Sequence, residues 1–458
     1  MPRRRASSPW ARAKVCAVRH ALVVPDRARR RVLLVAGPRG FTLPSVSLGR
    51  DHPGSVDTVL RAVARRHGIR ATVLRTLTRP RDRRTGIFHV ALELERLDDR
   101  APRTPGARWV SRATLAGVRL SRPEDRTALA AWSARGGRRA AWMRPGWRSR
   151  AVRWCERQIG APATRMTQLR AWESSTVLRL DTRKGRFYFK AVEPPCDHEP
   201  RLTRWLDRRA PGRVASVVAV GGGGRWLLMR EAPGRALRAS ARLGDWVRTA
   251  HEYGRLQRAL AGAPARLRLL RARRRDLGWL ARQLGPMLAD ARGLAAGGRA
   301  RLRRGEIARL RRLAPALGAR CRALARLGVP LALEHGDLWA VNVIVGRGGP
   351  VFLDWEDAVV AHPFWGAFML PWSHGFWDRW GHRSAAAARV RAAYLAGWAG
   401  AEEVQGYRDA FSRSRVLAPL HHAAIWWHDV LPHLQTSLET AALIPFFLRR
   451  VLEASRAV

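Results

Sequence analysis

The N-terminal third of the chain alternates short apolar runs with turn-forming segments. Such runs predict β-strands, and apolar positions that recur every three or four residues predict helices. We expect strands at residues 15–24, 31–36, 71–77, 86–94 and 107–110, and helices at residues 56–69 and 123–136. The stretch GGRRAAWMRPGWRSR follows at 136–150, and its Gly, Pro and Arg content predicts a linker. A first domain is therefore predicted at residues 1–135.

Beyond residue 150 the pattern predicts a few strands first and then mostly helices. The segment WESSTVLRLDTRKGRFYFKAV at 172–192 predicts strands around a turn, the last of them the alternating GRFYFK. Apolar residues at helical spacing predict helices at 199–210, 246–262, within 265–327, and at 385–398, 405–430 and 437–454. The chain is thus predicted to combine a second β-rich part with a large helical part.

The segment LALEHGDLWAVNVIVGRGGPVFLDWE, residues 331–356, carries the candidate chemistry. Its runs VNVIV and VFLD are separated by GRGG and predict a β-hairpin, which should bring Asn342 and Asp354 side by side. Amide and carboxylate oxygens suit Mg²⁺ that bridges nucleotide phosphates. Asp337, on the preceding loop, would face the same place and act on an attacking hydroxyl. These groups predict phosphoryl transfer, and the alternative is a buried hairpin with incidental polar ends.

The strings HGDLWAVN and FLDWE resemble the catalytic and metal-binding segment of the aminoglycoside phosphotransferase-like kinases, a family that includes choline and homoserine kinase relatives. The resemblance implies an α+β, bilobal protein-kinase-like fold with ATP and Mg²⁺ as cofactors. It implies a small β-rich lobe at 151–231 and a large helical lobe at 232–458. In such loops the His more often holds the loop backbone than moves protons. We therefore take Asp337, and not His335, as the catalytic base.

One residue departs from the family pattern. The segment after DWE usually carries a further Asp, two residues before an Ala, that supports the catalytic loop. Here AVVAHPFWGAF has Gly366 at that place. The departure leaves the predicted metal ligands intact and raises the question of what holds the loop.

The formal net charge of +51 raises the possibility of a nucleic-acid partner. The basic residues are nearly all Arg and are scattered along the chain, which a coding bias toward GC-rich codons also produces, so no specific nucleic-acid partner is expected. Only three residues are Lys: Lys14, Lys184 and Lys190. Lys190 ends the strand GRFYFK, where phosphoryl-transfer kinases place a Lys on the α- and β-phosphates. Arg cannot replace Lys freely in such a tight site.

The resemblance also implies further nucleotide contacts. Glu199, at the start of a predicted helix, would pair with Lys190. The strand RWLLMREAPGRAL at 225–237 predicts the hinge between the lobes, with Met229 to Glu231 against the adenine. Small polar residues would cover the phosphates, although an ordinary polar turn is as good an explanation of the same string. These are Ser174, Ser175 and Thr176.

The first domain resembles a Nudix domain in its strand order, in FTLPS before the helix, and in RAVARRHGI within it. The last string aligns with half of the Nudix box. Three positions where that box has metal-binding Glu hold Ala62, Arg65 and Arg66 instead. Since Arg cannot coordinate a cation, we expect an α/β/α fold without Nudix hydrolysis.

Other sequence signals are weak. The four cysteines are far apart without CxxC spacing, which predicts neither a zinc site nor a disulfide framework. The basic N-terminus runs into no apolar stretch typical of a signal peptide, and no window resembles a membrane span. We expect a cytoplasmic protein, where ATP is available. The sequence does not indicate an oligomeric state.

The acceptor is expected to be a small hydroxylated molecule. Aminoglycosides are polycations that need an acidic pocket, so a chain this basic favours a neutral or anionic acceptor. Two alternatives stay open: a nucleotide-binding pseudokinase or regulatory protein, and an Arg-rich nucleic-acid-associated protein. The presence of Lys190, Asp337, Asn342 and Asp354 argues against the first, and the lack of aromatic residues among the scattered Arg argues against the second.

Overall fold

The computed structural model describes residues 18–48, 56–78, 88–134, 139–262, 267–268, 270–290, 293–294, 301–399, 404–433 and 442–456. The chain forms two compact units. One comprises Lys14–Pro194 and Trp226–Met229, and the other includes Pro195–Arg225 and Arg230–Val458. The first unit joins the predicted N-terminal domain to strands predicted for the small lobe, so this division differs from the predicted domain boundaries. The chain passes from one unit to the other after Met229, within the predicted hinge.

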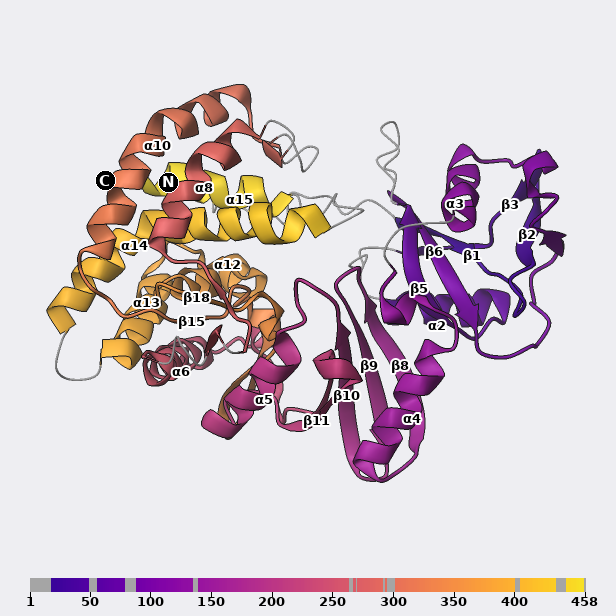
Figure 1. Cartoon of the computed structure of the whole chain (residues 1–458), viewed down its shortest axis with the longest axis horizontal. Helices are drawn as coiled ribbons and strands as arrows, with labels where there is room; N and C mark the ends of the chain where they lie inside the picture. The colour runs from indigo at the N-terminus through magenta and orange to yellow at the C-terminus, as the bar shows by residue number, and fades with distance from the viewer. Residues whose placement is uncertain are drawn as a thin grey trace. The chain divides into compact units, whose positions relative to one another are not determined.

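The N-terminal domain contains the strands and helices predicted from the sequence and two further short strands. They are β1 (Val18–Val23), β2 (Arg31–Gly37), β3 (Gly40–Thr42), β4 (Ser45–Leu48), β5 (Ala71–Thr78), β6 (Phe88–Arg96), β7 (Ala107–Ser111), α2 (Val56–His67) and α3 (Pro123–Ser133) (Figure 1). One sheet has the order β4-β1-β6-β5, with β1 parallel to β6, and a smaller sheet has the order β3-β2-β7. Strands β3 and β4 were not predicted, since their short segments carry no clear alternation.

Helices α2 and α3 pack on opposite faces of the larger sheet. Successive side chains of a strand point to opposite faces, and β1 accordingly places Leu22 in one apolar core and Val23 in another. The first core contains Val59 and Val63 of α2, and the second contains Trp132 of α3. The domain is therefore layered as helix, sheet and helix.

The predicted linker lies partly outside the described residues, at 136–138. From residue 139 the segment is packed structure, with a 3₁₀ turn at Ala141–Met143 and the first residues of α4 (Trp147–Ile159). Trp142 and Trp147 are buried, with 2% and 3% of their surface exposed. Pro145 and Gly146 directly precede α4, and the two buried tryptophans anchor the segment on either side of them.

The remaining strands of the first unit form one sheet with the order β12-β10-β9-β8. Their bounds are β8 (Ala163–Ala171), β9 (Ser175–Thr182), β10 (Gly185–Val192) and β12 (Trp226–Arg230). Helix α4 packs against this sheet through Trp154, whose ring lies 5.8 Å from that of Phe189 and 5.4 Å from that of Trp226. Such edge-to-face contacts hold the helix beyond what apolar burial alone supplies.

Gln168 connects the N-terminal domain to this second sheet through side-chain hydrogen bonds. The side chain of Gln168, on β8, accepts hydrogen bonds from Val73 N and Thr72 Oγ1, both at 2.8 Å, and donates to Val73 O at 3.0 Å. Its amide thus pairs with edge strand β5 as a neighbouring backbone would. Because Gln168 is buried, losing these partners would leave polar groups unsatisfied.

The second unit is mostly helical and contains the predicted hairpin. Its helices include α5 (Glu199–Arg209), α6 (Leu243–Leu260), α8 (Leu277–Ala289), α10 (Arg304–Ala325), α11 (Met369–Trp372), α12 (His374–Trp380), α13 (Ala385–Ala399), α14 (Val404–Ile425) and α15 (Leu443–Ala454). Its strands include β11 (Val217–Gly221), β13 (Arg235–Ala236), β14 (Arg273–Arg274), β15 (Ala332–Glu334), β16 (Val343–Gly346), β17 (Gly349–Phe352) and β18 (Val359–Ala361). The helix predictions are confirmed within the described residues; residues 265–266, 269, 291–292, 295–300 and 437–441 of the predicted ranges lie outside them. None of the described helices is long and apolar enough to span a membrane.

Candidate active site

The predicted hairpin is confirmed and sets the base of the site. Strands β16 and β17 pair from Val343 opposite Phe352 to Gly346 opposite Gly349. The ladder continues for one more step, because Leu353 N donates to Asn342 O at 2.8 Å. Asn342 therefore pairs with the residue that precedes Asp354, which brings both candidate metal ligands to the same end of the hairpin.

The side chain of Asn342 holds the candidate base. Asn342 Nδ2 donates to the backbone oxygen of Asp337 and to its carboxylate Oδ2, both at 2.9 Å. Asn342 is 6% exposed, and the Asp337 side chain is half-buried. With its nitrogen bound to Asp337, the amide oxygen of Asn342 is the atom that can coordinate a cation. The same residue thus orients the base and serves as a candidate ligand.

His335 ties the catalytic loop to the strand that leads to Asp354. Its Nε2 lies 2.9 Å from Leu353 O, and its Nδ1 lies 3.3 Å from Asp337 N. A neutral ring that donates from Nε2 and accepts at Nδ1 satisfies both contacts. The buried ring also lies against Trp355, with 4.5 Å between centroids. His335 therefore holds backbone on two sides, as the resemblance implied.

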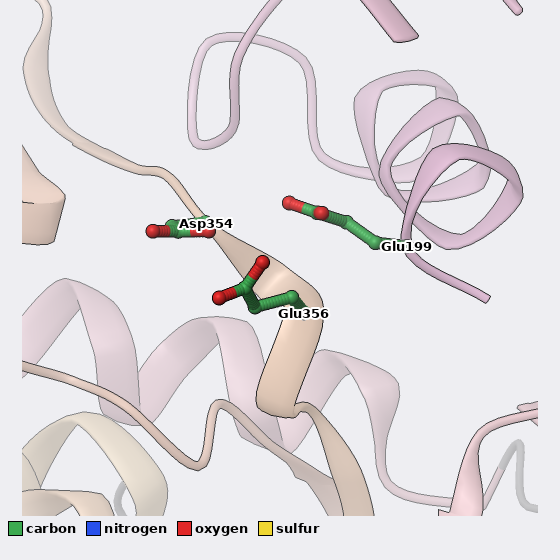
Figure 2. A group of neighbouring side chains, drawn as sticks. All are labelled: Glu199, Asp354 and Glu356. Carbon is green, nitrogen blue, oxygen red and sulfur yellow. The ribbon is translucent and has the colours of Figure 1, made fainter. Parts of the chain in front are cut away.

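Three carboxylates gather beside the hairpin. Figure 2 shows Glu199, from the start of α5, pointing toward Asp354 and Glu356. One oxygen of each lies within 4.8 Å of the other two. Asp354 adopts a positive φ of 66°, which non-glycine residues rarely adopt and which occurs often at functional sites. Carboxylate oxygens are hard donors of the kind that Mg²⁺ binds, so the chemistry of these residues fits the ion that the sequence predicts.

A fourth carboxyl group, that of Asp357, lies beside these acidic residues and is held in its neutral form. Burial raises the pKa of Asp357 well above its usual range, and the charges of Asp337 and Glu356 raise it further. Gly336 has a φ of 78°, and a Cβ there would lie 2.2 Å from Asp357 O. The catalytic loop and the carboxylate turn are therefore in direct backbone contact, which only Gly at position 336 permits.

Glu334 supplies the carboxylate that supports the catalytic loop beside Gly366. Its carboxylate Oε1 accepts from Tyr253 Oη at 2.9 Å and from His335 N at 3.1 Å. Its Oε2 accepts from Gln257 Nε2 at 3.0 Å and from Gly366 N at 3.1 Å. A Cβ at position 366 would lie 2.6 Å from Glu334 Oε1. The strand before the loop thus supplies a supporting carboxylate, and it fills the space that a side chain at position 366 would need.

The predicted nucleotide contacts fall in both units. Lys190 is buried on β10 in the first unit, while Glu199 belongs to the second, so their pairing stays a prediction. Met229 is half-buried on β12, and Glu231 follows that strand and is exposed. Their contact with adenine also stays a prediction.

The Ser/Thr string lies partly inside the sheet. Ser174 is on the turn before β9, whereas Ser175 and Thr176 are strand residues with 1% and 0% exposure. The Thr176 hydroxyl donates to Arg170 O at 2.9 Å. The hydroxyl of Thr176 is therefore engaged within the sheet, and Ser174 is the member of the string best placed on the turn.

Comparison with known families identifies the chain. The model of the phosphotransferase enzyme family, APH, matches residues 165–407, which is more than half of the chain. The protein belongs to the phosphotransferase enzyme family. This match supports a small-molecule phosphotransferase with a mixed α+β fold, and it leaves the acceptor unspecified. Comparison with curated proteins gave no match.

Several solved structures are similar to the chain. A choline/ethanolamine kinase family protein from Mesorhizobium loti has 15% identity and a TM-score of 0.46, over 63% of this chain and 87% of that one. A macrolide 2′-phosphotransferase from Brachybacterium faecium has 16% identity and a TM-score of 0.42, over 65% and 96%. Spectinomycin phosphotransferase, in complex with ADP and spectinomycin, has 11% identity and a TM-score of 0.42, over 67% and 98%.

Sequence reasoning missed three acidic residues of the site, Glu334, Glu356 and Asp357. Glu356 lies two residues after the predicted Asp354 in the DWE string, and that proximity was a usable signal. Glu334 directly precedes the HGD string, but nothing local distinguishes a buried Glu that accepts four hydrogen bonds from an exposed one. Glu199 was predicted as a partner of Lys190, which stays a prediction, and its proximity to Asp354 was not foreseen.

Mg²⁺ is expected to raise the melting temperature by a few degrees, because a bound cation offsets repulsion among these carboxylates. Free ion at ten times its Kd would contribute about 1.4 kcal/mol. The shift should shrink in Asp354→Asn and Glu356→Gln but not in Asp409→Asn, a matched control whose carboxylate forms an ion pair with Arg413. Thermal unfolding with and without Mg²⁺ measures the effect. Equal shifts in all four proteins would exclude this site.

Proposed function

We propose that the protein is an ATP-dependent phosphotransferase with a bilobal protein-kinase-like fold, which moves the γ-phosphate of ATP to a hydroxyl group of a small molecule. The observation that carries the proposal is the pair of hydrogen bonds from Asn342 to Asp337 at the base of the hairpin that ends at Asp354. Phosphoryl transfer requires a base and metal ligands held in one fixed arrangement. The family match supports the same chemistry.

In the proposed reaction, Asp337 accepts the proton of the acceptor hydroxyl. The acceptor oxygen then forms a bond to the γ-phosphorus while the bond to ADP breaks. Asn342 fixes Asp337 Oδ2, which leaves Oδ1 to face the hydroxyl. Mg²⁺, held by Asn342 and Asp354 with Glu199 and Glu356 nearby, would neutralise charge on the phosphates. Most of the rate gain would come from positioning and charge neutralisation.

The remaining nucleotide contacts belong to the same proposal. Lys190 would hold the α- and β-phosphates, Ser174 would lie over them, and the backbone from Met229 to Glu231 would meet the adenine. We place the reaction in the cytoplasm, where ATP is available. Ser175 and Thr176 support this arrangement less well than Ser174, because both are buried strand residues.

A transfer assay tests the proposal. ATP and Mg²⁺ are incubated with a panel of neutral and anionic hydroxylated metabolites, and both ADP and phosphorylated product are measured by mass spectrometry. We expect at least one acceptor to increase ADP release and to gain a phosphate. Saturable ATP binding without acceptor-dependent turnover would favour the pseudokinase alternative. Tight, salt-sensitive binding of DNA with no ATP binding would favour the nucleic-acid alternative.

We also propose a Nudix-like fold without Nudix catalysis for residues 1–135. The helix, sheet and helix layering supports the fold. Exposed Arg65 and Arg66 stand at positions where that chemistry needs Glu, which supports the loss of activity. Incubating the full chain with nucleoside diphosphate derivatives and Mg²⁺ should give no hydrolysis, and measured hydrolysis would overturn this part of the proposal.

A further inference from the structure

The second unit contains a cavity of about 220 Å³ apart from the residues described above. It is bounded by the segment Phe368–Trp372, by the loop after α12, and by α13, α14 and α15. Pockets for drug-sized ligands are typically about 300–1,000 Å³. This cavity therefore suits a smaller molecule.

The walls of the cavity combine positive charge with aromatic surface. Four guanidinium groups line it, and a single carboxylate, that of Glu453, faces them. The apolar part of the wall consists of aromatic rings. The guanidinium groups belong to Arg383, Arg391, Arg415 and Arg450, and the rings belong to Phe368, Trp372 and Phe411.

Glu453 is already engaged by two of these cations. It accepts from Arg383 at 2.7 Å and also from Arg450, whose guanidinium lies over the rings of Trp377 and Phe446 at 5.1 and 5.3 Å. Arg450 is therefore fixed on three sides. The one carboxylate of the wall is thus occupied within the protein.

The other two cations have no such partner. Within the described residues, neither Arg391 nor Arg415 forms an ion pair with a carboxylate. Arg391 is half-buried and donates to His382 O at 3.4 Å. Its burial, together with the charge of Arg415, lowers its pKa below the usual value. Two like charges held together beside a cavity are stabilised by an anion that reaches both.

We propose that this cavity binds a small organic anion, a carboxylate or phosphate monoester with an aromatic or aliphatic body. The anionic group would bind Arg391 and Arg415, and the body would lie against Phe368, Trp372 and Phe411. Planar guanidinium groups suit both carboxylates and phosphates. The ligand's burial against the rings would add an apolar contribution that inorganic phosphate lacks.

The cavity is close to the catalytic loop through one layer of aromatic rings. Trp372 lies 6.3 and 6.1 Å from Phe446 and Phe447, which lie 6.4 and 6.3 Å from Trp339 of the loop. Ser373, which follows Trp372 in the chain, accepts a hydrogen bond from Ala340 N at 3.0 Å. A ligand in the cavity would therefore bear on the loop that carries Asp337. The ligand would act as an effector, because these rings stand between the cavity and Asp337.

Binding is tested by calorimetry on the full chain with phenyl phosphate, benzoate and benzyl alcohol as probes. We expect both anions to bind and benzyl alcohol to bind at least ten times more weakly. Arg391→Gln and Arg415→Gln should each weaken phenyl phosphate binding about tenfold or more, a loss of about 1.4 kcal/mol. Arg413→Gln is the matched control, since Arg413 is on the same helix and pairs with Asp409 outside the cavity.

The control separates this cavity from general attraction to a basic surface. If Arg413→Gln weakens binding as much as the cavity variants, or if benzyl alcohol binds as well as phenyl phosphate, the proposal is overturned. Arg415 is exposed, so its variant should fold even if Arg391→Gln does not, which circular dichroism checks. Binding does not require catalysis, so this result is independent of the proposed function.

Mass spectrometry after incubation with ATP tests the role of the bound anion. An effector stays unmodified but changes the turnover of an acceptor. We expect both cavity variants to remove this change. A change in turnover that survives in both variants, or phosphorylation of the cavity ligand itself, would contradict the proposal.

Discussion

Asp337→Asn is expected to lower kcat for phosphoryl transfer by about 10²- to 10⁴-fold, the range of a positioned general base. An amide of the same shape can still accept the hydrogen bond from Asn342 through its oxygen, so the loop should keep its geometry. It cannot take a proton from the acceptor hydroxyl. Initial rates of acceptor-dependent ADP release measure the loss, and the KM for ATP should change little because Asp337 is not proposed to bind the nucleotide.

The matched control is Asp378→Asn, since Asp378 is a partly exposed carboxylate on α12 that lies 3.7 Å from His374. It should retain full activity. Unchanged turnover in Asp337→Asn, with an intact fold, would refute the proposed role of Asp337. If Asp337→Asn does not fold, the main contribution of Asp337 is instead structural, through its hydrogen bonds with Asn342. Thermal unfolding of the variant distinguishes these two outcomes.

Glu334→Ala and Gly366→Asp are each expected to destabilise the protein strongly, by about 2–4 kcal/mol, whereas the double variant should recover part of that loss. The Ala variant leaves the buried donors Tyr253 Oη and Gly366 N without the acceptor that Glu334 gives them. The Asp variant forces a side chain into space held by Glu334, because its Cβ would lie 2.6 Å from Oε1. In the double variant, the new carboxylate at position 366 takes the place of the lost Glu334 carboxylate.

Denaturant unfolding of the four proteins gives the coupling energy directly. We expect it to favour the double variant by roughly 1–2 kcal/mol, within the range found for residues in contact. Glu334→Ala with Gly366→Asn is the control, since it offers similar shape without charge. If the losses of unfolding free energy in the two single variants simply add in the double variant, the two positions do not share one carboxylate site.

The pH dependence of stability provides a second readout of Glu334. Burial raises the pKa of its carboxyl to about 7, despite the hydrogen bonds that lower it. The folded state then keeps a proton that the unfolded chain, with a pKa near 4.5, has already released. This group therefore makes the protein less stable as pH rises from about 4.5 to 7, by up to about 3 kcal/mol. Glu334→Gln should flatten that part of the profile.

Local pattern was enough to predict most secondary structure and part of the candidate site. The apolar runs on either side of GRGG encode a hairpin, and a hairpin brings its two ends together whatever surrounds it. Asn342 and Asp354 are therefore close for a reason that is readable in the segment itself. The helices of the second unit were equally readable, since one apolar face must be buried. The packing of the predicted linker was not readable, because a Gly/Pro-rich segment can still be anchored by buried Trp142 and Trp147.

The sequence by itself determined the hairpin, its polar ends, and the family to which they belong, because these depend on spacing over a few residues. Only the tertiary structure decided what surrounds them. Glu199 reaches Asp354 from a helix far away in the chain, Glu334 fills the space left by Gly366, and Gln168 pairs with an edge strand of the N-terminal domain. Each of these depends on which distant backbone lies within hydrogen-bonding distance, and no local pattern encodes that.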